Sequence, residues 1–281
     1  MKPMFRFLQR SLVILLVVAL ACPSEAFAAR KKKKRNRSQH LTANSAILID
    51  FNHNRRYFGR DIEQRVAPAS TTKVLTAILV LEKLPLDKYV TVNASALDVQ
   101  PTKMDAIAGE QYRVRDLLYA LLMKSANDAA EVLAEAVAGS QTEFVAMMNN
   151  KARDIGAKHS LFANAHGLPS RGAQYTTAYD MALIFRQALK YDFFRKAITF
   201  KYRIIYSKDG RRLFLKSHNK SLFLNWKADV YGKTGYTRQA QSCFVGYVPK
   251  GNDTLILSVF GCCKRWEDIK FIIERYGHLD L

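Results

Sequence analysis

Cysteine and histidine are scarce in this chain of 281 residues, which has four of the first and six of the second. Neither residue type shows a metal-ligand spacing, and no histidine lies in the sequence context of a classical serine triad. We therefore expect no metal and no other cofactor, and we expect all six histidines to be loop or surface residues. No internal repeat is visible, and the 49% hydrophobic content supports a sizeable core.

The chain also lacks an apolar run long enough to span a bilayer comfortably. Its first 28 residues instead have the parts of a secretory signal: early basic residues, the apolar run Leu12 to Ala21, and a small-residue cleavage site at Ala26 to Ala28. We therefore expect an exported protein. Lipid attachment at Cys22 and an uncleaved anchor are the alternatives.

Negative charge is scarce as well. The 44 Lys and Arg outnumber the 24 Asp and Glu, which gives a formal net charge of +20. Seven positive charges fall within Arg30 to Arg37, a run that should repel itself and be disordered. The run could contact an anionic membrane or wall polymer, or it could be only a solvated leader. Nucleic acid is not an expected partner, because an exported protein rarely meets it and no recognition motif accompanies the run.

Cleavage after Ala28 would leave an odd number of cysteines, namely Cys243, Cys262 and Cys263. One disulfide from Cys243 to either of the other two is possible. We favour the interpretation that the three are small buried strand residues.

The chain does contain a hydroxyl three residues before an amine. Ser70 and Lys73 stand at the start of an apolar segment, and a helix there would place both side chains on one face, about one turn apart. A serine hydroxyl needs a base to become a nucleophile, and lysine can be that base only when burial or nearby positive charge lowers its pKa. Such pairs also occur by chance, but this one predicts a nucleophile and its base.

The remaining pattern predicts strands toward both ends of the chain and helices between them. The expected strands cover residues 45–50, 56–58, 89–92, 200–207, 212–216, 230–236, 242–248 and 254–260. The expected helices cover residues 74–84, 114–123, 128–136, 143–155, 177–190 and 266–276. The region from about 85 to 195 is therefore expected to be a mostly helical insertion.

Two further short motifs follow Ser70-x-x-Lys73 along the chain. Ser125-Ala126-Asn127 falls on a corner between two buried helices, where a rigid core can hold functional polar groups, and Lys233-Thr234-Gly235 falls in an expected strand. The three motifs in this order are the known signature of penicillin-binding proteins and class A β-lactamases. In this chain an alanine replaces the aspartate that is usual in the middle motif.

From about Asn44 to Gly277 the sequence resembles the serine D-alanyl-D-alanine carboxypeptidases, the low-molecular-mass penicillin-binding proteins of the serine β-lactamase superfamily. Supporting stretches are Leu117 to Leu122, Asn164 to Leu168 and Tyr236-Thr237. The resemblance implies an α/β (α+β) fold, with a five-stranded antiparallel sheet flanked by helices and a mostly helical subdomain. It also implies a bacterial cell-wall enzyme of the periplasm or wall space. This enzyme would remove the terminal D-alanine of peptidoglycan stem peptides and would be inhibited covalently by β-lactam antibiotics.

The resemblance gives catalytic roles to four residues. Ser70 would attack the carbonyl between two D-alanines and form an acyl-enzyme, and Lys73 would accept its proton. Ser125 would relay a proton to the departing D-alanine. Asn127 would hold the substrate amide and orient Lys73.

Substrate-binding roles are implied for the third motif and the residue after it. Lys233 and Thr234 would bind the terminal carboxylate, and Gly235 would keep a side chain off an edge strand along which the substrate backbone lies. The backbone N–H groups of Ser70 and Tyr236 would form the oxyanion hole. Lys264 or Arg265 could be a second carboxylate contact or only a surface charge.

Three other functions would use the same fold. A class A β-lactamase needs an acid after the second motif to activate water, and no Asp or Glu occurs from residue 155 to residue 179, so penicillin should stay on Ser70. A D-alanyl-D-alanine endopeptidase would use the same residues, and the sequence does not separate it from a carboxypeptidase. A non-enzymatic sensor of penicillin or wall polymer is disfavoured because Ser70, Lys73 and Ser125 are all present.

The expected domain organisation is a signal peptide over residues 1–28, a basic disordered leader over 29–42 and one catalytic domain over 43–281, without a C-terminal β-domain. Two positions depart from the pattern of the family. Gln241-Ser242 stands where a glycine is common, and Lys124 stands where apolar residues or proline are common. Both departures leave the chemistry intact and put the substrate preference in doubt.

Overall fold

The computed structural model describes residues 41–281. The predicted signal, the lipidation alternative at Cys22 and the basic run Arg30 to Arg37 lie outside these described residues. Within the described part, no helix combines the length and the apolar character needed to cross a bilayer. The described residues belong to one compact unit.

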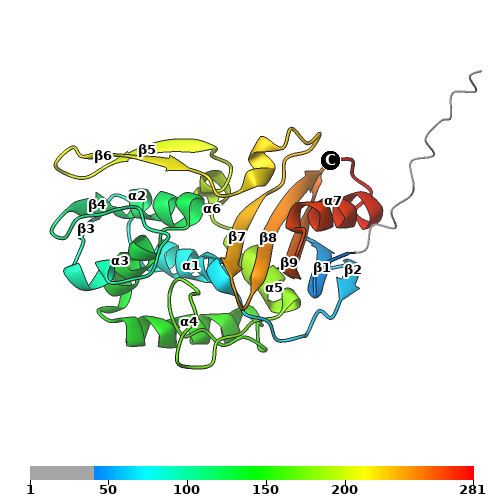
Figure 1. Cartoon of the computed structure of the whole chain (residues 1–281), viewed down its shortest axis with the longest axis horizontal. Helices are drawn as coiled ribbons and strands as arrows, with labels where there is room; N and C mark the ends of the chain where they lie inside the picture. Colours follow the sequence, from blue (N-terminus) through cyan, green and yellow to red (C-terminus); the bar gives the residue numbers. More distant parts are fainter. Residues whose placement is uncertain (1–40) are drawn as a thin grey trace, which may run out of the picture. The chain divides into compact units, whose positions relative to one another are not determined.

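A five-stranded antiparallel sheet, in the order β2-β1-β9-β8-β7, forms one half of the unit (Figure 1). Its strands are β1 (Ser45–Asp50), β2 (Arg56–Arg60), β7 (Tyr231–Thr237), β8 (Gln241–Lys250) and β9 (Asp253–Cys262). The sheet predicted from the sequence is therefore confirmed, and β7 is one of its two edges.

The sheet is buried on both faces, because helices cover each side of it. Every residue of β1 is buried. Ile47 and Ile49 belong to the larger core, which includes α5 (Ala178–Ala188), whereas Ala46 and Leu48 belong to a smaller core with α7 (Arg265–Tyr276). Strand alternation thus sends successive side chains into two different cores.

The other half of the unit is helical and surrounds α1 (Lys73–Lys83), which is buried from Lys73 through Val80. Helices α3 (Asn127–Ala138) and α4 (Gln141–Ile155) pack against it, and α2 (Val114–Tyr119) and α6 (Asp192–Ala197) belong to the same half. The predicted cap of α5 is present, since the Thr177 side chain accepts a hydrogen bond from the Asp180 N–H. A two-stranded ribbon of β3 (Tyr89–Thr91) and β4 (Gln111–Arg113) lies in the same region.

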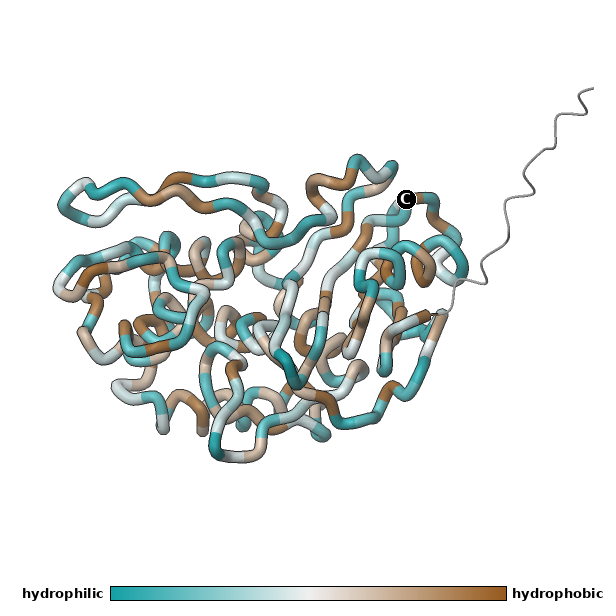
Figure 2. The backbone as a smooth tube through the Cα atoms, viewed as in Figure 1, coloured by the Kyte–Doolittle hydropathy of each residue, from teal (hydrophilic) through white to brown (hydrophobic). Residues whose placement is uncertain are grey.

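A hairpin of β5 (Tyr202–Tyr206) and β6 (Arg212–Lys216) stands apart from the main sheet (Figure 1). Each strand has an apolar stretch, Ile204-Ile205 in β5 and Leu213 to Leu215 in β6, and the middle of the hairpin is accordingly brown in Figure 2. Ile205 and Leu215 are buried, whereas the neighbouring side chains on the opposite face are exposed. A short 3₁₀ turn, η4 (Lys220–Phe223), leads from this hairpin toward β7.

The structure differs from the sequence prediction in several local features. The helix expected over 114–123 changes after Tyr119 into a wider π turn, η3 (Ala120–Lys124), and Ser70 lies in a 3₁₀ turn, η1 (Ala69–Thr72), ahead of α1. Strand β4 and helix α6 were missed, since each is too short to show a clear period.

The prediction of three buried strand cysteines is wrong for Cys263. Cys243 and Cys262 are buried, but Cys263 follows the last residue of β9 and is exposed. All three are free thiols.

Candidate active site

Ser70 and Lys73 lie one turn apart where η1 meets α1. The Lys73 amine donates a 3.1 Å hydrogen bond to Ser70 Oγ. Lys73 is fully buried, whereas Ser70 is only half-buried. The arrangement gives the hydroxyl a basic partner on the protein side and leaves it open to a ligand on the other.

Two further acceptors fix the Lys73 amine. It donates to Asn127 Oδ1 at 2.6 Å and to the His166 carbonyl at 2.8 Å. Burial, and next the charge of Lys233, hold the pKa of Lys73 well below the usual lysine value, while Asp128 and Glu131 act in the opposite direction. A lysine with a lowered pKa gives up its proton more readily than an ordinary lysine, and in its neutral form it can accept a proton from Ser70.

The second motif begins at a strained backbone position. Ser125 follows η3 with φ of 64°, in the left-handed region that side chains other than glycine rarely adopt. Backbone hydrogen bonds fix the corner on both sides, from the Ala126 N–H to the Ala120 carbonyl and from the Asn127 N–H to the Thr102 carbonyl. The Asn127 Nδ2 group donates to the Gln100 carbonyl at 2.8 Å.

Lys233 links the third motif to the second. Its side chain is fully buried, and its amine donates to Ser125 Oγ at 2.8 Å and to the Thr234 carbonyl at 2.9 Å. Burial, followed by the nearby charge of Arg265, lowers the pKa of Lys233 to about 7. The three sequence motifs therefore meet in one place, although they lie on η1, η3 and β7.

Gly235 lets the edge strand β7 pack closely against the turn that carries Ser70. A Cβ atom at Gly235 would lie 3.1 Å from Ala69 Cβ and 3.2 Å from the Ser70 backbone nitrogen. The sequence predicted that Gly235 keeps the outer edge of the strand free for substrate. This geometry supports a different reason for the glycine. The glycine is required on the inner side, where strand and turn meet.

Of the two cations considered after β9, only Arg265 lines the cleft. Its guanidinium donates to the carbonyls of Gly235 and Cys243 at 3.0 and 2.9 Å. Lys264 is exposed and instead pairs with Glu267 at 3.3 Å.

His166 is a loop residue, as expected for the histidines, and what the sequence did not show is that it is buried. Its Nε2 lies 3.1 Å from Glu131 Oε1, and its carbonyl accepts from Lys73. The loop reaches this depth because Gly167, with φ of 84°, packs against Ala69, where a Cβ would lie 1.8 Å from the Ala69 carbonyl oxygen. Asn164-Ala165-His166-Gly167-Leu168 was singled out in the sequence only as a resemblance, and no periodic pattern marked its burial.

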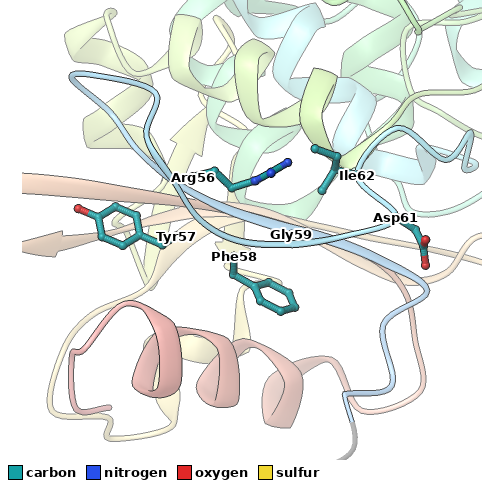
Figure 3. A pocket seen from close by; sticks show the side chains of 6 residues that line it. All are labelled: Arg56, Tyr57, Phe58, Gly59, Asp61 and Ile62. Atoms are coloured by element: carbon teal, nitrogen blue, oxygen red, sulfur yellow. The ribbon is translucent and has the colours of Figure 1, made fainter.

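The site opens into a cavity of about 800 Å³. On one side the cavity is lined by Ser125 and by Thr234 to Tyr236, and on the other side by residues of β6 and η4. A second hollow, of about 400 Å³, lies along β2 from Arg56 to Gly59 (Figure 3). Its lining holds no residue of the three motifs, whereas Ser125, Thr234 and Gly235 line the first cavity, so we place the chemistry beside the first cavity.

Comparison with known proteins decides the family. The family model described as D-alanyl-D-alanine carboxypeptidase, peptidase S11, matches residues 31–263. The chain belongs to this family. The family predicted from the three motifs is confirmed.

Among the relatives is the D-alanyl-D-alanine carboxypeptidase DacF of Bacillus subtilis, 32% identical over 257 residues, which are 89% of this chain and 65% of that protein. The carboxypeptidase DacB2 of Mycobacterium tuberculosis is 32% identical over 218 residues, which are 77% of this chain and 74% of that protein. The chain spans 60% of the carboxypeptidase DacC of Escherichia coli. It therefore matches less than two thirds of the length of several relatives.

Solved structures of similar proteins confirm the fold. A D-alanyl-D-alanine carboxypeptidase from Mycobacterium tuberculosis matches with a TM-score of 0.79 and 29% identity, covering 85% of this chain and 92% of that one. A point mutant of a Streptomyces DD-transpeptidase matches with a TM-score of 0.79 and 27% identity, covering 85% of this chain and 99% of that one.

Proposed function

We propose that this protein is a serine D-Ala-D-Ala carboxypeptidase that removes the terminal D-alanine of peptidoglycan stem peptides through an acyl-enzyme on Ser70. The observation that carries this proposal is the linked pair of hydrogen bonds from Lys73 to Ser70 and from Lys233 to Ser125, at 3.1 and 2.8 Å. Membership of the family supports it.

The first chemical step joins Ser70 to the substrate. Neutral Lys73 accepts the proton of the Ser70 hydroxyl while Ser70 Oγ attacks the carbonyl carbon between the two D-alanines. The carbonyl oxygen becomes an oxyanion, which the backbone N–H groups of Ser70 and Tyr236 stabilise; loss of one such donor typically costs about 3 kcal/mol.

The second step releases the terminal D-alanine. Because Ser125 Oγ accepts a hydrogen bond from Lys233, its own proton is free to point at the leaving nitrogen. Ser125 passes that proton on as the C–N bond breaks, and Ser125 is reprotonated from the side of the two lysines. Water then hydrolyses the ester on Ser70, which frees the shortened peptide.

Asn127 orients Lys73 through its side-chain oxygen, to which the lysine donates. Its Nδ2 group is engaged by the Gln100 carbonyl. To hold the substrate amide, the Asn127 Nδ2 group must therefore release the Gln100 carbonyl and donate to the substrate instead.

The substrate carboxylate is bound at the other end of the site. Lys233 contributes a positive charge and Thr234 a hydroxyl donor, and both lie beside the Ser125 hydroxyl. Arg265 adds a second positive charge at the cleft wall. A site that binds a free carboxylate here selects peptides in which the residue to be released is also the last residue. Release of the last residue is the reaction of a carboxypeptidase.

The endopeptidase alternative uses the same residues, but the named relatives that match this chain are carboxypeptidases. The test is to offer a pentapeptide and a cross-linked muropeptide side by side and to follow free D-alanine and cross-link cleavage. The proposal predicts D-alanine release from the pentapeptide at a much higher rate. Faster cleavage of the cross-linked substrate would replace it with the endopeptidase.

We propose residues 43–281 as the catalytic domain, exported by the segment 1–28, with β-lactams as covalent inhibitors of Ser70. Contact of Arg30 to Arg37 with an anionic membrane or wall polymer stays a prediction. Fractionation of cells that express the full chain, with and without residues 29–42, would test both the export and the contact.

A further inference from the structure

The cleft extends well beyond the residues that the proposed reaction uses. A cavity of about 800 Å³ is within the size of pockets that enclose a drug-sized ligand, so it has room for more than two alanine residues. Its far wall comes from β6 and η4. We call this surface the lysine-aromatic wall and define it as Phe214, Lys216, Lys220 and Phe223.

The charge of the cavity is of one sign. Its lining includes four cationic side chains, Lys124, Lys216, Lys220 and Arg265, and no Asp or Glu. Two of these cations have other partners, because Lys124 pairs with Asp105 at 3.0 Å and Arg265 is assigned to the terminal carboxylate of the substrate. Among residues 41–281, no carboxylate lies within salt-bridge distance of Lys216 or Lys220. Both lysines are thus available to an anionic ligand.

Aromatic rings hold the wall in place without neutralising it. The Lys216 amine lies 5.6 Å from the centre of the Phe223 ring, a cation–π contact that positions the amine and keeps its charge. Tyr202, opposite Lys216 in the hairpin register, stacks on Phe214 at 5.7 Å and meets Phe223 edge-on at 5.6 Å. Phe214 is nevertheless 57% exposed, so its ring offers an apolar surface to a ligand.

Substrate geometry decides which part of a ligand reaches this wall. In a carboxypeptidase the leaving side of the scissile bond is a single residue, and its carboxylate is assigned to Lys233, Thr234 and Arg265. Any further contact must therefore come from the acyl side, the part of the peptide that stays on Ser70.

We propose that the lysine-aromatic wall is a subsite for a carboxylate on the acyl side of the substrate, and that it makes the enzyme prefer acidic donor peptides. The carboxylate pairs with Lys216 and Lys220, and the methylenes of the side chain that carries it pack on Phe214 and Phe223. This inference rests on the proposed function and adds the substrate class to it.

The experiment uses two synthetic peptides that end in D-alanyl-D-alanine and differ in one group. One peptide carries a side-chain carboxylate upstream of the scissile bond, and the other carries the corresponding primary amide. The wild-type chain should hydrolyse the acidic peptide with a kcat/KM about tenfold higher, as expected for two partly exposed ion pairs. In K216A/K220A the ratio should fall close to one, through a loss on the acidic peptide alone.

Three control variants separate the subsite from general charge. K216R/K220R should keep the preference, and K216E/K220E should invert it toward the amide. K158A/K190A removes the same two charges from exposed positions that do not line the cavity, and it should keep the wild-type ratio. Unchanged labelling of each variant by a fluorescent penicillin would show that Ser70 and the fold are intact.

The outcomes are distinguishable. Hydrolysis of both peptides at equal rates by the wild type, or an unchanged ratio in K216A/K220A, would overturn the subsite and leave the carboxypeptidase in place. A ratio that falls equally in K158A/K190A would assign the preference to net charge and would also overturn the subsite. If the wild type hydrolyses neither peptide and takes up no penicillin, the proposed function itself fails.

Discussion

The Lys233 amine donates to the Ser125 hydroxyl at 2.8 Å, although 108 residues separate them in the chain. This bond joins the edge strand of the sheet to the corner between two helices. It also places a second buried amine close enough to lower the pKa of Lys73. The two lysines therefore divide the work: one must be neutral to accept a proton, and the other must be charged to bind a carboxylate.

This division predicts a bell-shaped pH dependence of kcat/KM for a peptide with a free carboxylate. Deprotonation of Lys73, whose pKa is held well below the usual lysine value, gives the rising limb, and loss of the charge of free Lys233 near its pKa of about 7 gives the falling limb. In Lys233→Arg the falling limb should move to much higher pH while the rising limb stays, since a guanidinium keeps its charge. A falling limb that stays in place in that variant would assign it to another group.

Removal of the Lys233 charge should affect substrates according to their last group. Lys233→Ala should lower kcat/KM for a peptide with a free carboxyl end roughly 10- to 100-fold more than for its amidated form, because a hydrogen bond to a charged group is worth about 1.5–3 kcal/mol. Lys233→Ala also removes the hydrogen bond to Ser125 and the charge beside Lys73, and this loss affects both peptides. The ratio of their kcat/KM values therefore isolates the contribution of the carboxylate. Equal losses on both peptides would show that the lysine does not bind the carboxylate.

The left-handed backbone of Ser125 predicts that activity and stability separate at this residue. Ser125→Ala and Ser125→Gly should both slow D-alanine release strongly, since each removes the hydroxyl. Only glycine relieves the strain at φ of 64°, so Ser125→Gly should be more stable than Ser125→Ala by about 1 kcal/mol. Denaturant unfolding of the two variants measures the difference, and an equal or lower stability of the glycine variant would argue against strain.

Because Gly235 packs closely against the turn that carries Ser70, we predict that adding a single methyl group at Gly235 slows acylation of Ser70. Gly235→Ala would push on Ala69 and on the Ser70 nitrogen, the expected oxyanion donor, and should slow acylation by penicillin roughly tenfold or more. Gly172→Ala is the matched control, because the nearest atom to its added Cβ, at 3.9 Å, is in ordinary contact. Equal acylation rates in the two variants would show that the turn absorbs the methyl group without cost.

Much of this site could be predicted from the sequence because its reactive side chains belong to short motifs, which lie on or beside regular elements. The apolar run of α1 and the alternation of β8 and β9 predict their own burial, and the three motifs predict which residues meet. Backbone shape was harder to predict. The left-handed Ser125 and the π turn before it depend on how η3 packs against the rest of the core, and no local residue preference shows them.

Contacts across the chain account for the remaining gaps. The burial of His166 depends on Glu131 and on the close approach of Gly167 to Ala69, and nothing in the loop sequence records either. The lysine-aromatic wall forms only when the β5–β6 register places Tyr202 opposite Lys216, beside η4. Such relations appear only once the strands are paired.

The most direct measurement is the intact mass of the protein after incubation with a β-lactam, followed by peptide mapping. The account predicts a gain of one drug molecule on Ser70. The adduct should persist, because no Asp or Glu from residue 155 to residue 179 is present to activate water. It also predicts no gain in Ser70→Ala. An adduct on another residue, or one that forms equally in Ser70→Ala, would contradict the assignment of Ser70 as the nucleophile.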